Sequence, residues 1–398
     1  MRTWHFTTRW LLGSQFAARL LGLVNNVLLA RLLAPALFGS FVQAMAVAGA
    51  LAPLADAGVS AVLTRHVARR PQARFMLSAA LGLRFLQGAI LWVGVLAVAW
   101  WVRSSSQFAL ALVLAGAYWV TACFIQLLAG VARARVQAHL EARSVLLERG
   151  ITVPAAAFGA VALGLTGALV GVLAGGVAGL LYLVRRLSFP RIRANTLAWK
   201  CLLSAGAPLA IGDVCHGLII RLDILAVGFT FGDQSAGYYG GASTLLWAGM
   251  LVPGSMALAL VPARSQVGSS STLDHRILRW MLVVAGLMAL LLSAGAPVWV
   301  RLLYGSAFGP AADALRVLAW AFLPAAVVAW GNAVLLVRHR TAWVAVVAAA
   351  GLTCLAVCLW WLPMFGPLFA AVAQVVTQCL MALLLWWLVR HSLEASSG

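Results

Sequence analysis

Apolar runs long enough to cross a lipid bilayer recur along the whole chain, and they restrict the fold more than any other feature. A transmembrane helix needs about 17 to 25 predominantly apolar residues. Hydrophobic residues make up 64% of the 398 residues and charged residues only 9%. This pattern predicts an all-α, polytopic membrane protein with about twelve transmembrane helices, near residues 8–30, 39–62, 77–101, 107–130, 146–165, 167–184, 203–231, 238–262, 278–299, 314–337, 342–362 and 366–389.

The fifth and sixth predicted helices have little room, because Arg149 and Arg185 bound them. One solution is that Glu148 and Arg149 dip into the membrane edge. The other is a pair of helices that is tilted little and ends abruptly at the sequence "GLTG". The sequence leaves both alternatives open.

The net charge of +19 indicates membrane topology rather than a nucleic-acid site. If the N-terminus is cytoplasmic, most of the 28 Lys and Arg residues fall in cytoplasmic loops and helix ends, as the positive-inside rule requires. Both termini are therefore predicted to be cytoplasmic, and the basic patches are expected to attract anionic lipid head groups. The six cysteines form no CxxC pair and are interpreted as small hydrophobic residues, so no metal site is predicted.

The chain also has the pattern of an internal duplication. A shift of 198 residues aligns "FGSFVQA" (38–44) with "AGYYGGA" (236–242) and places Asn25 opposite Asp223. An offset of half the chain predicts two six-helix lobes in parallel orientation. The predicted parts are an N-terminal lobe at 1–184, a basic cytoplasmic linker at 185–200 and a C-terminal lobe at 201–398.

Five segments resemble one family. They are "LLARLLAPALFGSF" (28–41), "LAPLADAGVSAVLTRHVAR" (51–69), "RLDILAVGFTFGDQSAGYYGGAS" (221–243), "LVPGSMALALVPARSQ" (251–266) and "RLLYGSAFGPAADALRVLAW" (301–320). They look like the polysaccharide biosynthesis and O-antigen flippase family of the multidrug/oligosaccharidyl-lipid/polysaccharide exporter superfamily. The resemblance runs in order along almost the whole chain. The chain lacks the two extra C-terminal helices of the similar lipid II flippases, which argues against a peptidoglycan role.

The resemblance implies a flippase in the cytoplasmic (inner) membrane of a bacterium. Its substrate would be a polyprenyl-diphosphate-linked oligosaccharide, such as an O-antigen, capsule or exopolysaccharide unit. Alternating access of two lobes around a central cavity would move this substrate between leaflets. Membrane lipids, a polysaccharide polymerase and glycosyltransferases are the implied partners, without nucleic acid. No cofactor is expected, and a proton or sodium gradient is the candidate energy source.

A stripe of polar residues in the first predicted helix fits such a cavity. Gln15, Arg19, Gly22 and Asn26 follow one another at spacings of 4, 3 and 4, which places them on one helix face. An arginine at the bilayer centre costs about 2.5 to 3.5 kcal/mol even on the lenient insertion scale. The stripe is therefore expected to line a watery cavity. Because a guanidinium matches phosphate oxygens, Arg19 is a candidate contact for the diphosphate.

Two more predicted helices carry polar residues away from their ends. Arg84 and Gln87 form a shorter stripe in the third helix, while His216 and Asp223 are seven residues apart on one predicted face of the seventh. The candidate substrate-binding residues of the cavity are Arg19, Asn26, Gln15, Arg84 and Arg221. The candidate coupling residues are Asp223, Asp213 and His216.

Structural ion pairs are the alternative interpretation of these charges. Arg19, Arg84 or Arg221 would then pair with Asp213 or Asp223 instead of contacting substrate. The three helices carry three arginines and two aspartates, so one positive charge would stay uncompensated. Asp56 near the cytoplasmic end of the second helix is expected to be structural, at the turn before Arg65.

Three other functions compete with the flippase interpretation. A multidrug or other amphiphile antiporter of the same superfamily is the nearest, although cationic drugs favour a cavity with excess carboxylate and this sequence has excess arginine. An integral-membrane glycosyltransferase would need a catalytic carboxylate or histidine cluster on a sizeable external loop, and the predicted external loops are short. A non-transporting scaffold explains the fold but not the intramembrane charges. The protein is therefore expected to be a transporter and not an enzyme.

Overall fold

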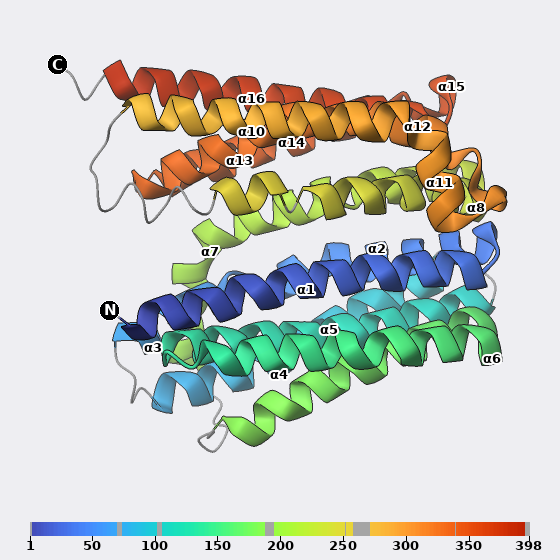
Figure 1. Cartoon of the computed structure of the whole chain (residues 1–398). Helices are drawn as coiled ribbons and strands as arrows, with labels where there is room; N and C mark the ends of the chain where they lie inside the picture. The colour runs from blue at the N-terminus through green and yellow to red at the C-terminus, as the bar shows by residue number, and fades with distance from the viewer. Residues whose placement is uncertain are drawn as a thin grey trace. The chain divides into compact units, whose positions relative to one another are not determined.

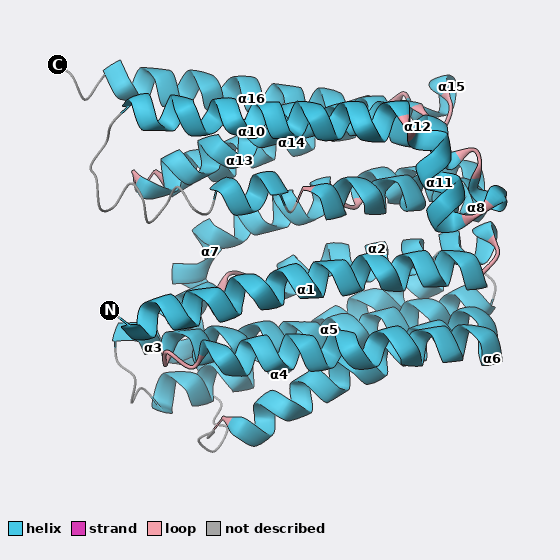
Figure 2. Cartoon of the chain, viewed as in Figure 1, coloured by secondary structure: helices cyan, strands magenta, loops and turns pink. Residues whose placement is uncertain are grey.

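The computed structural model describes residues 2–69, 74–101, 106–187, 195–250, 252–257, 271–338 and 340–394. Within these ranges the regular elements are helices joined by short loops, and no strand is present (Figure 2). This confirms the predicted all-α fold. A helix satisfies its backbone hydrogen bonds internally, which is what the bilayer interior demands of a spanning segment.

The chain divides into two compact units, Met1–Gly217 and Leu218–Gly398. The helices of the first unit are α1 (Arg2–Leu32), α2 (Pro35–Asp56), α3 (Val59–Arg69), α4 (Arg74–Trp101), α5 (Ser106–Ala134), α6 (Ala138–Arg186) and, up to Gly217, α7 (Thr196–Ile219). Those of the second unit are α8 (Leu222–Gly249), α10 (Ser271–Ala294), α11 (Ala296–Tyr304), α12 (Ala311–Leu318), α13 (Phe322–Val337), α14 (Thr341–Trp360), α15 (Leu362–Phe365) and α16 (Phe369–Glu394).

In each unit one helix packs against four others. In the first unit α5 packs against α2, α3, α4 and α6, and α6 also runs along α1 (Figure 1). In the second unit α16 packs against α8, α12, α13 and α14. The core of the first unit includes the fully buried Leu63, Leu77, Leu127 and Leu202, which come from α3, α4, α5 and α7.

The protein is a multi-pass membrane protein. Nine segments of the described residues are long and apolar enough to cross a membrane. Two of them, Ala138–Arg186 and Leu209–Ala257, are 49 residues long, and each contains a glycine with non-helical backbone angles. The total of twelve helices stays a prediction.

The first long segment folds back on itself at Gly164, inside the "GLTG" sequence. Ser144 Oγ donates a hydrogen bond to the Gly179 carbonyl at 2.9 Å, although 35 residues separate them. Glycines of the second arm lie directly against the backbone or side chains of the first, and a Cβ would overlap the opposite arm at Gly167, Gly171 and Gly175. The predicted pair of crossings therefore turns at "GLTG", because small residues let the two arms approach closely.

The second long segment also folds back, at Gly232, which has a φ of +83°. The Tyr239 hydroxyl donates to Asp223 Oδ2 at 2.7 Å, and these residues are 16 apart in sequence. In one straight helix they would be about 24 Å apart. The chain therefore reverses between them.

Two predicted helices are interrupted, and the prediction of continuous helices is wrong there. The 39–62 segment breaks at Ala57 and Gly58, which have φ values of +47° and +72°. The 203–231 segment breaks at Ile220 and Arg221, between α7 and α8. Apolar composition extends across both breaks, so hydropathy does not reveal them.

The boundary between the units differs from the predicted lobe boundary. It lies at Gly217 and not in the linker 185–200, of which residues 188–194 lie outside the described part of the chain. The start of α7 belongs to the first unit because Trp199 Nε1 donates to the Ala79 carbonyl of α4 at 2.8 Å. Leu202 is also buried in the core of that unit.

Candidate functional site

The predicted stripe on α1 lies on a face that is open for part of its length. Gln15 and Arg19 are exposed, and Asn26 is half-buried. The neighbouring Phe16 and Leu20 are also more than half exposed, at 56% and 51%. Within the described residues Arg19 forms no ion pair, so the guanidinium lies on an apolar surface without a carboxylate beside it.

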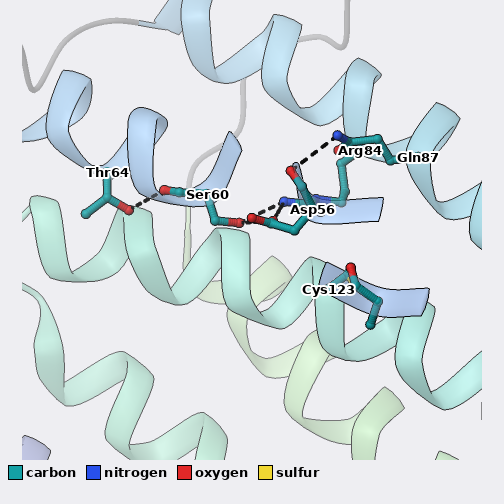
Figure 3. A network of polar contacts seen from close by, with 7 residues as sticks. Asp56, Ser60, Thr64, Arg84, Gln87 and Cys123 are labelled. Carbon is teal, nitrogen blue, oxygen red and sulfur yellow. Dashed lines mark hydrogen bonds and ion pairs between the residues drawn. The ribbon is translucent and has the colours of Figure 1, made fainter. Parts of the chain in front are cut away.

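Arg84 belongs to a different environment, a buried polar network of the first unit. Its Nη2 donates to Asp56 Oδ1 and, at 2.7 Å, to Ser60 Oγ (Figure 3). Ser60 Oγ donates to the same Asp56 oxygen at 2.6 Å, and Gln87 Nε2 donates to the Asp56 carbonyl at 3.3 Å. We refer to Asp56, Ser60, Arg84 and Gln87 as the break network, since Asp56 is the last residue of α2.

The break network gives Arg84 a partner that neither sequence interpretation proposed. Arg84 pairs with Asp56 and not with Asp213 or Asp223. Its side chain has no exposed area, so a substrate could reach it only after this pair had opened. The expected structural role of Asp56 agrees with the pair. No spacing rule predicts this pair, because the α2–α3 break interrupts the helix between Asp56 and Arg69.

Asp223 is the buried carboxylate of the second unit, with 1% of its surface exposed. Its Oδ2 accepts the 2.7 Å hydrogen bond from Tyr239, and its Oδ1 accepts one from the Ile224 backbone N–H at 2.7 Å. Sequence reasoning missed Tyr239, because only the reversal at Gly232 brings it back to Asp223. Other buried polar atoms of this unit have no hydrogen-bond partner among the described residues, including Ser243 Oγ on α8 and both polar side-chain atoms of Gln374 on α16.

The predicted face shared by His216 and Asp223 is wrong. His216 is exposed on α7 and Asp223 is buried in α8, and the break at Ile220 and Arg221 separates them. Asp213 is exposed on the same side of the break as His216, while the half-buried Arg221 directly precedes α8. The structure therefore assigns Asp213 and His216 to the first unit, and Arg221 and Asp223 to the second.

The charge balance also changes once Arg84 is paired with Asp56. Of the intramembrane charges considered from the sequence, Arg19 and Arg221 remain on the positive side and Asp213 and Asp223 on the negative side. The arginine excess expected from the sequence is thus absent. What distinguishes these groups is exposure, because Arg19 and Asp213 are exposed and Asp223 is not. No group of three or more His, Cys, Asp or Glu residues that could hold a metal ion occurs in the described ranges.

Comparison with known proteins places the chain in a family. Residues 7–268 match the family model described as "Polysaccharide biosynthesis protein". The chain belongs to this family. The match covers most of the chain and confirms the resemblance seen in the sequence motifs.

Solved structures show which fold this polysaccharide biosynthesis protein shares. It is similar to the lipid II flippase MurJ in an inward closed conformation, with a TM-score of 0.79 and 13% identity over 95% of this chain and 86% of that one. It is also similar to an inward-facing multidrug resistance MATE family transporter of the MOP superfamily, with a TM-score of 0.77 and 16% identity over 96% of both chains.

A third structure, a MOP superfamily transporter from Pyrococcus furiosus, is described as having a binding pocket of reverse polarity that suggests a different function. It has a TM-score of 0.61 and 13% identity over 98% of this chain and 95% of that one. Identities this low show the shared fold alone. No curated protein sequence matches the chain.

Proposed function

We propose that this polysaccharide biosynthesis protein is a flippase for a polyprenyl-diphosphate-linked oligosaccharide in the cytoplasmic membrane of a bacterium. The glycan would be an O-antigen, capsule or exopolysaccharide unit, and the two units would alternate access to it. The family membership supports a role in polysaccharide biosynthesis, and the fold shared with MurJ and MATE transporters supports movement of an amphiphile across the membrane. A polysaccharide polymerase and glycosyltransferases are the proposed partners.

The exposed Arg19 is the observation that carries this proposal. Arg19 lies near the middle of α1, a helix that is not among the nine described segments long and apolar enough to cross a membrane, between the exposed apolar side chains of Phe16 and Leu20. The cost of placing a charge at membrane depth is acceptable where the charge faces water or a ligand. A guanidinium is a planar fork of N–H donors that stays charged and binds phosphate oxygens in a bidentate manner. Gln15, one turn earlier on the same open face, adds a neutral donor and acceptor for sugar hydroxyls or phosphate. Asn26 extends this surface.

Coupling to an ion gradient is assigned to Asp223 in this proposal. It is a carboxylate without solvent contact, directly after a helix break, and breaks of this kind expose backbone groups to transported ions in secondary transporters. Protons or sodium ions are the candidate ions. Asp213 and His216 are the next candidates, and Arg221 at the break is a further candidate for substrate contact.

A multidrug antiporter is the second candidate function, and exposed Asp213 is the observation that favours it. A cationic drug needs an accessible carboxylate, and Asp213 offers one. The two functions differ in which charge matters. Loss of Arg19 would impair transport of a diphosphate, whereas loss of Asp213 would impair transport of a cation.

The test is flipping of a fluorescent polyprenyl diphosphate glycan in proteoliposomes. Arg19→Ala should remove a contact of about 1.5 to 3 kcal/mol, which is roughly a tenfold to hundredfold loss of affinity. Arg19→Lys keeps the charge without the fork and should fall between Ala and wild type. Arg301→Ala, at an exposed arginine outside the α1 stripe, is the matched control. Normal flipping by well-folded Arg19→Ala protein would contradict the proposal.

A further inference from the structure

One side chain is bonded to both sides of the α2–α3 break. Asp56 ends α2 and Ser60 lies in the first turn of α3. Arg84 Nη2 donates to Asp56 Oδ1 and to Ser60 Oγ, and the Ser60 hydroxyl closes the triangle with its own bond to Asp56 (Figure 3). Arg84 therefore joins two helices that have no continuous backbone ladder between them.

The backbone at the break needs this support. Ala57 has a φ of +47°, in the left-handed region that a residue with a Cβ adopts only against steric repulsion. Gln87, almost one turn after Arg84 on α4, donates to the carbonyl of Asp56 at 3.3 Å. Two residues of α4 thus hold the break from the same side.

The break is also one of the surfaces on which α7 packs. A Cβ at Gly58 would overlap the carbonyl oxygen of Gly206, and a Cβ at Gly206 would overlap the carbonyl oxygen of Ala57. The two backbones therefore touch without a side chain between them. The position of α7 depends on the dihedral angles of Ala57 and Gly58, because these angles shape the surface that Gly206 meets.

We propose that Arg84 is a positioning residue for α7. By bonding Asp56 and Ser60 it fixes the Ala57–Gly58 break in the shape against which Gly206 packs. α7 carries Asp213 and His216 and leads to the break before Asp223. An effect of Arg84 on coupling through these residues rests on the proposed function. Its effect on the position of α7 does not.

The ion pair with its hydrogen bonds and the Gly58–Gly206 backbone contact differ in strength. Opening a fully buried ion pair leaves both charges without water or a partner, and this is strongly unfavourable. The contact of Gly58 with Gly206 consists of dispersion between a few backbone atoms. The Asp56–Ser60–Arg84 triangle is therefore the stronger part, and α7 packs on the backbone that this triangle holds.

Spin-label distances in the full-length protein test directly whether Arg84 fixes the position of α7 relative to α3. One label is placed on the exposed native Cys201 of α7 and the other on Ala68→Cys, an exposed position of α3, after the other five cysteines have been replaced by alanine. The distance distribution should be narrow in this background. Arg84→Gln and Gly206→Val should each broaden or shift it. Gly150→Ala is the matched control, because a Cβ at Gly150 meets nothing within 4 Å.

Combined variants separate positioning from general destabilisation. Arg84→Gln together with Gly206→Val should shift the spin-label distances no further than the larger single change does. The reason is that both substitutions alter the same contact, that of Ala57–Gly58 with Gly206. Ser60→Ala is the milder variant for the case that Arg84→Gln protein does not fold, and it should also broaden the distribution. An unchanged distribution in folded Arg84→Gln or Ser60→Ala protein would overturn the proposal. The measurement needs no substrate, so failure of the flippase assignment would leave its result unaffected.

Discussion

Asp223 and Arg84 show what burial requires of a charged side chain inside a membrane protein. Both are almost fully buried, and each is bonded to residues that are distant in sequence. Arg84 meets an opposite charge, whereas the hydrogen bonds described for Asp223 come from a phenol and a backbone N–H. Of these two residues, Asp223 is therefore the one whose charge can change without breaking an ion pair.

Asp223→Asn tests this difference. The amide oxygen can accept from the Ile224 backbone N–H while the amide NH2 donates to the Tyr239 hydroxyl, which can also accept, so the protein should reach the membrane in normal amounts. Flipping driven by an imposed proton or sodium gradient should be lost, because the amide cannot take up a proton or supply a negative charge. Proteoliposome flipping with and without each gradient measures the effect. Asp313→Asn, at an exposed ion pair with Arg316, is the control and should flip normally. Gradient-driven flipping by Asp223→Asn protein would move the coupling role to Asp213 or His216.

At the scale of the element, α6 shows how two crossings fit into a short apolar segment. Its arms meet through glycines at intervals of four residues, so one glycine face of the second arm lies against the first arm. Close backbone approach of this kind provides packing where lipid supplies no hydrophobic driving force. Any side chain on that face would push the arms apart.

Gly171→Leu should therefore destabilise the hairpin. A Cβ at Gly171 overlaps the backbone of Ala155 and Ala156, and overpacking of this type costs about 1 to 3 kcal/mol or more. Folded yield after detergent extraction and the thermal unfolding midpoint should both fall. Gly150→Ala, in the same helix but with open space around it, should leave both at or above the wild-type value. Equal stability of the two variants would show that the arms do not pack as described.

At the scale of the whole molecule, the distribution of basic residues predicts the orientation in the membrane. Arg65 and Arg69 on α3, with Arg133 at the end of α5, belong to the predicted cytoplasmic side. The turn that contains Ser306, between α11 and α12, belongs to the predicted outer side.

Thiol labelling in intact cells measures this orientation. Ser306→Cys should react with an impermeant reagent, and Ala68→Cys should react only after the cells are opened, since both positions are exposed in the structure. Ser105, predicted outside, and Ser269, predicted inside, offer the same test but lie outside the described residues. Labelling of Ala68→Cys alone in intact cells would reverse the assigned orientation.

The sequence by itself determined the fold class and the family, because these follow from hydropathy and local motifs, and it offered the reversal at "GLTG" as one of two alternatives. It also singled out Arg19 and Asp223 as charges that need an explanation. Only the tertiary structure decided which partners the buried charges of Arg84 and Asp223 have. Arg84 pairs with Asp56, and Tyr239 returns to Asp223, because helix breaks and reversals bring together residues that apolar composition cannot relate. The breaks at Ala57–Gly58 and Ile220–Arg221 were invisible for the same reason. The break at Ala57–Gly58 is held by side chains of α4, and no local pattern encodes those contacts.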